Sequence, residues 1–265
     1  MEYMKKWIQL LAIVLVIVSC KSNASAQKEV GKTEPTQEYK QQVENLEQGI
    51  YFRGNGNEPE WSLKISEKTI EFTSLKPGFE SLKSVHVEPV RAMDANVKMY
   101  RVATETGTMS IQIMQQECIN RMSGEKSPYA VRIDISKNSN STNFSGCGNY
   151  VTDSSLHDIW VLEKLNGKVL VATDFVKELP NLEINSSTNN FLGFAGCNRM
   201  NGTLFFERGT LRFSNIITTR MACPNTNKES EFLKALQSTT TYKVENRRLI
   251  LSNPSGEKLV FKKVD

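Results

Sequence analysis

Residues 194–202 read FAGCNRMNG and place Cys197 directly after a glycine at the end of an apolar run. A related stretch, FSGCGNY, fills residues 144–150 and gives Cys147 similar surroundings. We interpret each stretch as a turn at the end of a strand. The phenylalanine packs inward, the glycine permits the turn, and the cysteine is held where a partner from a separate loop reaches it. The two stretches therefore predict two β-rich halves, each closed by its own disulfide.

The cysteine count supports this interpretation. Apart from Cys20, the chain has four cysteines, which are Cys118, Cys147, Cys197 and Cys223. An even count in an exported chain indicates disulfides, and four cysteines allow three pairings. The order along the chain favours Cys118 with Cys147 and Cys197 with Cys223, because each pair then lies inside one half. Each bridge would contribute about 3 to 4 kcal/mol by the chain-entropy argument.

A metal centre is the competing use of these cysteines. The chain has no C-x-x-C motif, and its two histidines, His86 and His157, lie at no ligand spacing from a cysteine or from each other. Zinc sites need such spacing. We therefore predict no metal and no other cofactor.

The N-terminus carries an export signal. Lys5 and Lys6 precede a mostly apolar run over residues 7–18, and Ser19 and Cys20 follow. A membrane-spanning helix needs about 20 apolar residues, so this shorter run is typical of a signal peptide and not of a permanent transmembrane helix.

The sequence IVSC at residues 17–20 resembles the lipobox of bacterial lipoproteins, in which the cysteine sulfur receives a lipid and the preceding peptide bond is cut. The resemblance implies a signal peptide over 1–19 and a lipid on Cys20 that holds the protein at a membrane of the bacterial cell envelope. Lys21 and Ser22 lack the aspartate that retains many lipoproteins at the inner membrane of some Gram-negative bacteria. We therefore expect the outer membrane.

Residues 20–45 contain almost no large apolar side chains and are rich in Ser, Lys, Gln and Glu. Such a segment buries too little surface to offset its ordering entropy, so we predict a flexible, solvated tether with a helical turn near residues 37–47.

The whole chain has 33 basic and 29 acidic residues; removing Glu2, Lys5 and Lys6 with the signal leaves 31 and 28, a net charge of +3. This small, scattered excess argues against a nucleic-acid partner.

The rest of the chain is predicted to be α+β, with two mainly antiparallel β domains over 46–153 and 157–265. Short alternating runs separated by turn residues fill both halves, and Met109, Ile111 and Ile113 point to one buried sheet face. We expect tight hairpin turns at Gly107 and Gly209. One helix is predicted over 227–239, capped by Asn225, Thr226 or Asn227. Its apolar stripe should pack on the curved sheet of the second domain.

The second half resembles the META domain family, the HslJ-like domains of bacterial envelope proteins. The resemblance covers residues 157–265 and rests on six features: Trp160, FAGCNRMNG at 194–202, TTRMACP at 218–224, ESEFLKAL at 229–236, Tyr242 and the closing strands LILS and LVF. It implies an antiparallel sheet wrapped against a helix, often on a lipoprotein, with links to heat and antibiotic stress. It supplies no agreed catalytic residue.

The first half resembles a domain of uncharacterised bacterial lipoproteins. This resemblance rests on GNGNEPEW at 54–61, the step from Cys118 to Ser123, Pro128-Tyr129 and Gly146-Cys147-Gly148. It implies no known role.

The asparagine-rich turn has two interpretations. Asn198, Asn201 and, in the first half, Asn149 suit a purely structural turn because short amides bond nearby backbone. Alternatively, Asn198, Arg199, Asn201 and Arg220 form a recognition patch in which the two guanidinium groups face a ligand.

No catalytic constellation is complete. Ser123 and Lys126 match S-x-x-K, but the companion motifs are missing and the pair lies in a loop instead of a helix. We therefore predict a non-catalytic, lipid-anchored envelope protein that supports stress tolerance by binding a periplasmic protein or small ligand. An inhibitor of an exported hydrolase such as lysozyme is the alternative, and an envelope hydrolase ranks below it.

Overall fold

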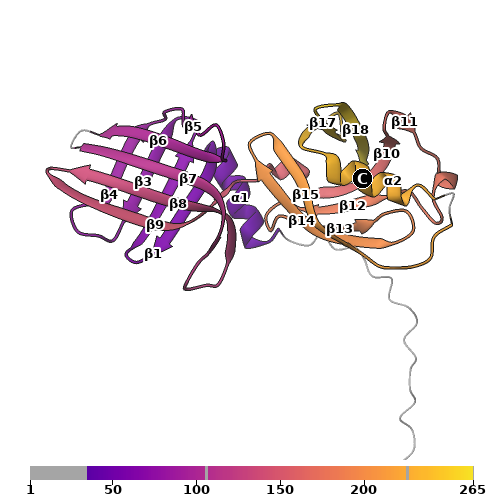
Figure 1. Ribbon diagram of the computed structural model, residues 1–265, viewed down its shortest axis with the longest axis horizontal. Helices are drawn as coiled ribbons and strands as arrows, with labels where there is room; N and C mark the ends of the chain where they lie inside the picture. The colour runs from indigo at the N-terminus through magenta and orange to yellow at the C-terminus, as the bar shows by residue number, and fades with distance from the viewer. Residues whose placement is uncertain (1–34, 105–106, 225–226, 265) are drawn as a thin grey trace, which may run out of the picture. The chain divides into compact units, whose positions relative to one another are not determined.

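The computed structural model describes residues 35–104, 107–224 and 227–264. The predicted signal peptide, Cys20 with its predicted lipid, and most of the predicted tether lie outside the described residues. From Thr36 onward the chain forms one compact unit. It contains two large antiparallel sheets and two α-helices among the described residues, which confirms the predicted α+β class (Figure 1).

The first sheet has nine strands in the order β4-β3-β2-β1-β9-β8-β7-β6-β5, and every neighbouring pair is antiparallel. The strands are β1 (Ile50–Asn57), β2 (Glu60–Ser66), β3 (Thr69–Ser74), β4 (Ser81–Val85), β5 (Val90–Arg91), β6 (Val97–Thr104), β7 (Gly107–Ile119), β8 (Lys126–Lys137) and β9 (Asn140–Tyr150). The sheet curls around its own core. Met109, Ile111 and Ile113 are at most 1% exposed, as their alternation predicts, and the residues between them face outward.

The stretch FSGCGNY is not a turn, contrary to the prediction. It forms the second half of β9, up to the last residue of the strand, and Phe144 is buried there. A Cβ on Gly146 would lie 2.0 Å from the carbonyl oxygen of Asn55 and 2.7 Å from the Trp61 ring. This glycine is therefore needed for the close approach of β1 and a core tryptophan. Gly107 likewise lies in β7 and not at a positive φ, since a Cβ there would meet the Ser136 carbonyl at 1.8 Å.

The second sheet closes on itself. Its strands are β10 (Asp158–Leu165), β11 (Lys168–Val169), β12 (Asn181–Asn185), β13 (Asn190–Phe194), β14 (Arg199–Glu207), β15 (Thr210–Thr218), β16 (Thr241–Glu245), β17 (Arg248–Asn253) and β18 (Gly256–Lys263). Pairing of β10 with β18 completes a ring, whose thinnest seam is the single pair Thr210 and Thr241 between β15 and β16. The β14–β15 hairpin turns at Gly209, which has φ +81° as predicted. Two short 3-10 turns, at Ser154–Leu156 and Ala172–Asp174, flank β10 and β11.

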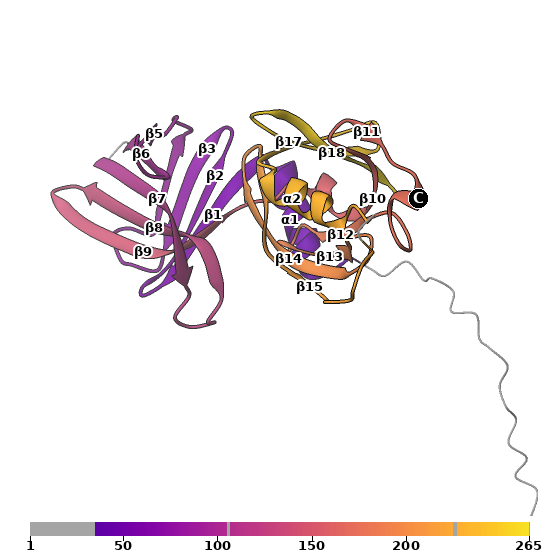
Figure 2. The ribbon, with the colours of Figure 1, turned by 45° about the vertical axis from the view of Figure 1, so that its right-hand side comes forward.

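Helix α2 (Glu229–Ser238) packs against the inner face of this ring, as predicted (Figure 2). Phe232 and Leu236 are fully buried, and the Phe232 ring meets Phe261 of β18 edge-on with centroids 6.3 Å apart. The capping position is Lys228, but the side-chain carboxamide oxygen of Asn227 accepts from the Glu229 N–H at 3.1 Å. One of the three predicted capping side chains thus satisfies a free N–H of the first turn. Asn225 and Thr226, the other two predicted capping residues, lie outside the described residues.

Residues 37–45, which the sequence analysis places in the tether, belong to helix α1 (Gln37–Glu47). Thr36 caps the helix by accepting from the Tyr39 N–H at 3.3 Å. The helix packs through polar contacts: Gln42 is 6% exposed, donates to the Thr152 carbonyl at 2.6 Å and accepts from the Ser186 hydroxyl at 3.1 Å. Hydrogen bonds to the folded part thus order a segment that has little apolar surface. Over the described residues, no helix is both long and apolar enough to cross a membrane.

Candidate functional site

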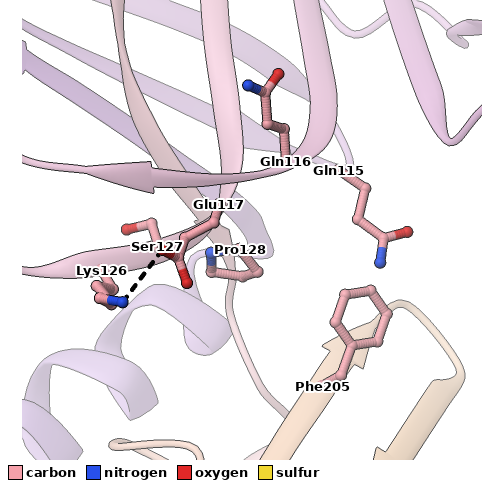
Figure 3. A pocket seen from close by; sticks show the side chains of 7 residues that line it. All are labelled: Gln115, Gln116, Glu117, Lys126, Ser127, Pro128 and Phe205. Atoms are coloured by element: carbon pink, nitrogen blue, oxygen red, sulfur yellow. Dashed lines mark hydrogen bonds and ion pairs between the residues drawn. The ribbon is translucent and has the colours of Figure 1, made fainter.

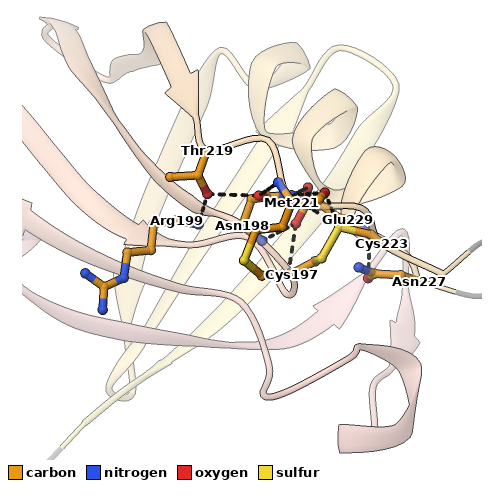
Figure 4. The surroundings of a disulfide bond; sticks show 8 residues. All are labelled: Cys197, Asn198, Arg199, Thr219, Met221, Cys223, Asn227 and Glu229. Carbon is orange, nitrogen blue, oxygen red and sulfur yellow. Dashed lines mark hydrogen bonds between the residues drawn. A yellow bond between two sulfur atoms is a disulfide. The ribbon is translucent and has the colours of Figure 1, made fainter.

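The predicted patch around the second Gly-Cys stretch divides into a buried part and a surface part. Asn198 is 4% exposed and lies beside the Cys197–Cys223 disulfide (Figure 4). Its amide nitrogen donates to Glu229 at 2.9 Å, while its carbonyl oxygen accepts from the Met221 N–H and the Thr219 hydroxyl, both at 2.8 Å. The amide of Asn198 is therefore occupied within the protein and does not face a ligand.

Glu229 joins this turn to the start of α2. One of its carboxylate oxygens accepts from the backbone N–H groups of Cys197 and Asn198, at 2.9 and 2.6 Å. Gly196, at φ +102°, makes the turn, and a Cβ there would lie 2.1 Å from the Phe175 ring. The disulfide pairing is the expected one, and the turn has the structural role that the sequence analysis gives as its first interpretation.

One detail of that interpretation is wrong. Phe194 ends β13 as expected, but it is only half-buried and shares its side of the strand with the exposed Leu192, so it does not pack inward. Alternation along β13 turns Phe191 to the core instead, where it is 1% exposed.

The other three patch residues are exposed. Arg199 and Asn201 lie on the outer face of β14, and Arg220 lies in the segment after β15. The guanidinium group of Arg199 points away from the buried cluster (Figure 4). These three side chains remain accessible to a partner, whereas Asn198 does not.

Two other groups of residues, a cluster of possible metal ligands and the S-x-x-K loop, are candidates for chemistry. Ligand atoms of Cys197, Cys223 and Glu229 lie within 4.8 Å of one another, but both sulfur atoms are bonded in the disulfide and are not thiolate ligands. In the S-x-x-K loop, Lys126 pairs with Glu117 at 3.1 Å, and the Ser123 hydroxyl accepts only from the Glu125 N–H at 3.2 Å. The lysine therefore does not contact the serine that it would have to activate.

Figure 3 shows the hollow beside Lys126, which measures about 360 Å³ and is lined by residues of β7 and β8 and by Phe205. The Glu117–Lys126 ion pair lies at its rim. A larger cavity lies on the outer face of the first sheet, and it is a site that sequence reasoning missed.

The larger cavity exists because the end of the β7–β8 hairpin bends across the sheet. Pairing of β7 with β8 is irregular between Gln115 and Cys118, and beyond this point residues 116–122, here called the arm, lie over the outer face. The Cys118–Cys147 disulfide ties the arm to β9, with Cα atoms 5.4 Å apart. Asn57 of β1 donates to Asn120 at 2.7 Å and holds the tip. Because β9 and β8 separate β1 from β7, these two links require the arm to cross β8 and β9.

The groove under the arm has a volume of about 580 Å³. Its lining comprises residues of β1 and the following turn (Asn55, Gly56, Asn57, Glu58), of β7 and the arm (Met114, Gln116, Glu117, Cys118, Ile119, Asn120, Arg121, Met122), and of β8 and β9 (Ala130, Val131, Arg132, Asn143, Ser145, Gly146, Cys147). Most of the side chains are polar, and small residues such as Ala130 and Ser145 form part of the floor. The only signal in the sequence was the step from Cys118 to Ser123, which does not show that the hairpin bends.

Comparison with known proteins follows the division between the two sheets. Residues 153–265 match the model of the META domain family, the family that the sequence of this part of the chain resembles. None of the curated proteins compared with the chain matches it significantly.

Two solved structures are similar to part of the chain. One, described as an NMR structure of the protein from Burkholderia xenovorans, is 27% identical, with a TM-score of 0.34, and the match covers 42% of this chain and 86% of that one. The other, also an NMR structure, is 24% identical, with a TM-score of 0.33, and the match covers 40% of this chain and 89% of that one.

Proposed function

We propose that the protein is a non-catalytic binding protein of the bacterial cell envelope, held at the outer membrane by a lipid on Cys20. In this role it supports stress tolerance by binding a periplasmic protein or small ligand. The lipobox resemblance at residues 17–20 and the family association of META domains with envelope proteins support the location. Two disulfides also fit an oxidising compartment outside the cytoplasm.

The groove under the arm is the observation that carries the binding role. Its volume of about 580 Å³ falls in the range of small-molecule sites, roughly 300 to 1,000 Å³. Its floor consists of paired strands and one wall is held by a disulfide, so its shape is fixed before a ligand arrives. Among the described residues that line it, none is a histidine or a lysine, and both cysteines are oxidised. The lining does hold the carboxylates of Glu58 and Glu117 and the hydroxyl of Ser145, but no histidine, lysine or free thiol of the described chain accompanies them, and this favours binding over nucleophilic catalysis.

The exposed tip of the arm favours inhibition of an exported hydrolase as a second candidate. Met122 is 78% exposed and Ile119 is 53% exposed, so the tip presents apolar side chains on a braced loop. A loop of this kind is suited to insertion into an enzyme cleft. Co-purification with lysozyme, abolished by Met122→Asp, would support this candidate.

The binding role is tested by closing the groove. Ser145→Trp puts a large ring on the groove floor, whereas Ser141→Trp puts the same ring on the same face of β9 outside the groove. In a deletion strain challenged with heat or a cell-wall antibiotic, we expect Ser141→Trp to restore growth and Ser145→Trp to fail, with equal protein levels for both. Equal restoration of growth by the two variants would show that the groove is not needed for the function. Cys20→Ser tests the anchor separately, since the protein should lose its lipid and leave the membrane fraction.

A further inference from the structure

The groove leaves one positive and one negative side chain uncompensated. Four charged side chains line it, and two have partners: Arg132 pairs with Asp134 at 3.2 Å and Glu117 with Lys126 at 3.1 Å. Glu58 and Arg121 form no ion pair within the part of the chain that the structure describes. A ligand of one sign would satisfy one of these groups and be repelled by the other. A ligand that carries both an ammonium and a carboxylate satisfies both.

The two unpaired charges lie near each other in space although they are distant in sequence. Glu58 follows Asn57 in the turn after β1, and Arg121 follows Asn120 in the arm. The side chains of Asn57 and Asn120 are hydrogen-bonded at 2.7 Å, which brings the two short segments together. Glu58 and Arg121 nevertheless stay beyond ion-pair distance. The charges of a suitable ligand therefore belong to one small molecule and not to the distant ends of a long polymer.

The remaining polar groups are suited to peptide bonds. Five primary amides line the groove, and three of them, Asn55, Gln116 and Asn143, are exposed and have no hydrogen-bond partner among the described residues. A primary amide offers both a donor and an acceptor, as a peptide group does. Ala130 and Ser145 keep the floor low, so an extended backbone can approach the sheet.

We propose that the groove binds a short peptide with free amino and carboxyl ends. The Glu58 carboxylate receives the ammonium, the Arg121 guanidinium receives the carboxylate, and the asparagine and glutamine amides contact the peptide groups between them. This assignment rests on the proposed function and gives its groove a ligand class.

Calorimetric titration of the purified, oxidised full chain at low salt tests the assignment. The probes are trialanine with both ends free, its N-acetyl form, its C-terminal amide and the doubly blocked peptide. Trialanine should bind about tenfold more tightly than the doubly blocked peptide, because two charge pairs with the exposed Glu58 and Arg121 together contribute about 1.4 kcal/mol. Added salt should weaken the binding of trialanine more than that of the blocked peptide.

Single substitutions assign each end. Glu58→Gln should weaken the binding of trialanine about threefold to tenfold and leave the binding of the N-acetyl peptide unaffected. Arg121→Gln should weaken the binding of trialanine by a similar factor and leave the binding of the C-terminal amide unaffected. Glu60→Gln and Arg101→Gln are matched controls, since both residues are exposed and lie outside the groove. All four variants keep the sheet intact, so a thermal melt equal to that of the wild type separates lost binding from misfolding.

Three results would overturn the ligand class. Equal affinity for trialanine and for the doubly blocked peptide would show that the terminal charges of the peptide do not contribute to binding. Equally tight binding of phosphoethanolamine, which carries both charges without a peptide group, would favour a lipid headgroup. Absence of binding by every peptide would reject the class outright. None of these results decides the broader binding role, which the comparison of Ser145→Trp with Ser141→Trp tests independently.

Discussion

The two Gly-Cys stretches look alike in sequence, yet the structure uses them in opposite ways. Around Cys197 the glycine turns the chain, the neighbouring asparagine is buried, and the disulfide adjoins the start of α2. Around Cys147 the glycine lies inside strand β9 at no positive φ, and the disulfide ties the arm to the outer face of the sheet above a groove. The first arrangement stabilises a core, and the second shapes a surface. A disulfide motif alone therefore does not reveal whether it serves stability or binding.

Removing each disulfide should produce the largest effects and should separate these roles. The loops span 29 residues for Cys118–Cys147 and 26 for Cys197–Cys223, so chain entropy predicts a similar loss of about 3.5 kcal/mol for either pair. Cys197→Ala with Cys223→Ala should lose more, because the buried Asn198 network also loosens. Chemical denaturation of the two double variants measures the difference.

Binding provides the second half of that test. Where it remains folded, the variant with Cys118→Ala and Cys147→Ala should lose trialanine binding, since the arm is released from β9. The variant with Cys197→Ala and Cys223→Ala should keep its affinity at temperatures below its melting point. If both bridges affected affinity equally, the division between core and surface roles would be wrong.

The carboxylate of Glu229 should be the next most important group. Glu229→Ala removes the acceptor for two backbone N–H groups and for the Asn198 amide, so we expect a loss of about 2 to 3 kcal/mol. Glu231→Ala is the control in the same helix turn, because among the described residues the Glu231 side chain accepts a hydrogen bond only from the exposed Asn166. A thermal melt in which the two variants match would mean that the turn does not depend on this link.

Acid should weaken a third region, where the tip of the β14–β15 hairpin meets the first sheet. Burial raises the pKa of Glu207, but hydrogen bonds from Lys98, Tyr129 and Asn96 outweigh it and hold the pKa below its usual range. A carboxyl whose pKa is lower in the folded state adds stability above its unfolded pKa, near 4.3, and this stability is lost as the pH falls through the folded value.

Glu207→Gln tests this contact. The variant should be less stable at pH 7, because Lys98, which is 5% exposed, loses the carboxylate with which it pairs and keeps its hydrogen bond to Asn96. The stability of the variant should fall less steeply than that of the wild type between about pH 5 and 3. Parallel pH profiles for the two proteins would contradict the assignment. The disulfide variants should keep the wild-type slope, since neither bridge contacts Glu207.

Much of this architecture was accessible from the sequence, and the failures have physical causes. Alternation along β7 and the apolar stripe of α2 revealed their buried faces, because burial of one face of a strand or helix makes apolar residues recur at a fixed spacing. The prediction failed at Gly146, because glycine serves both a close backbone approach and a positive φ, and the sequence does not distinguish the two uses. Gly146 has the first role and Gly196 the second, although their neighbouring residues are similar. The groove was invisible, since it depends on where β7 bends and on an Asn57–Asn120 contact between residues far apart in the chain. The buried state of Asn198 likewise depends on Glu229, 31 residues later.

The smallest stability effect should come from the tip of the arm, where it sharpens the contrast between the two disulfides. The carboxamide oxygen of Asn120 accepts from Asn57, at 2.7 Å, and from the N–H groups of Met122 and Ser123. Asn120→Ala should cost about 1 kcal/mol, since these bonds are partly exposed to water and the released groups can be hydrated. Asn120→Asp keeps the acceptors and should recover most of that stability.

Affinity for trialanine should nevertheless fall in Asn120→Ala, because the charges of Glu58 and Arg121 are then no longer held together while the Cys118–Cys147 bridge still ties the base of the arm. An unchanged affinity would mean that the disulfide alone shapes the groove, and that the contact at the tip only stabilises the hairpin.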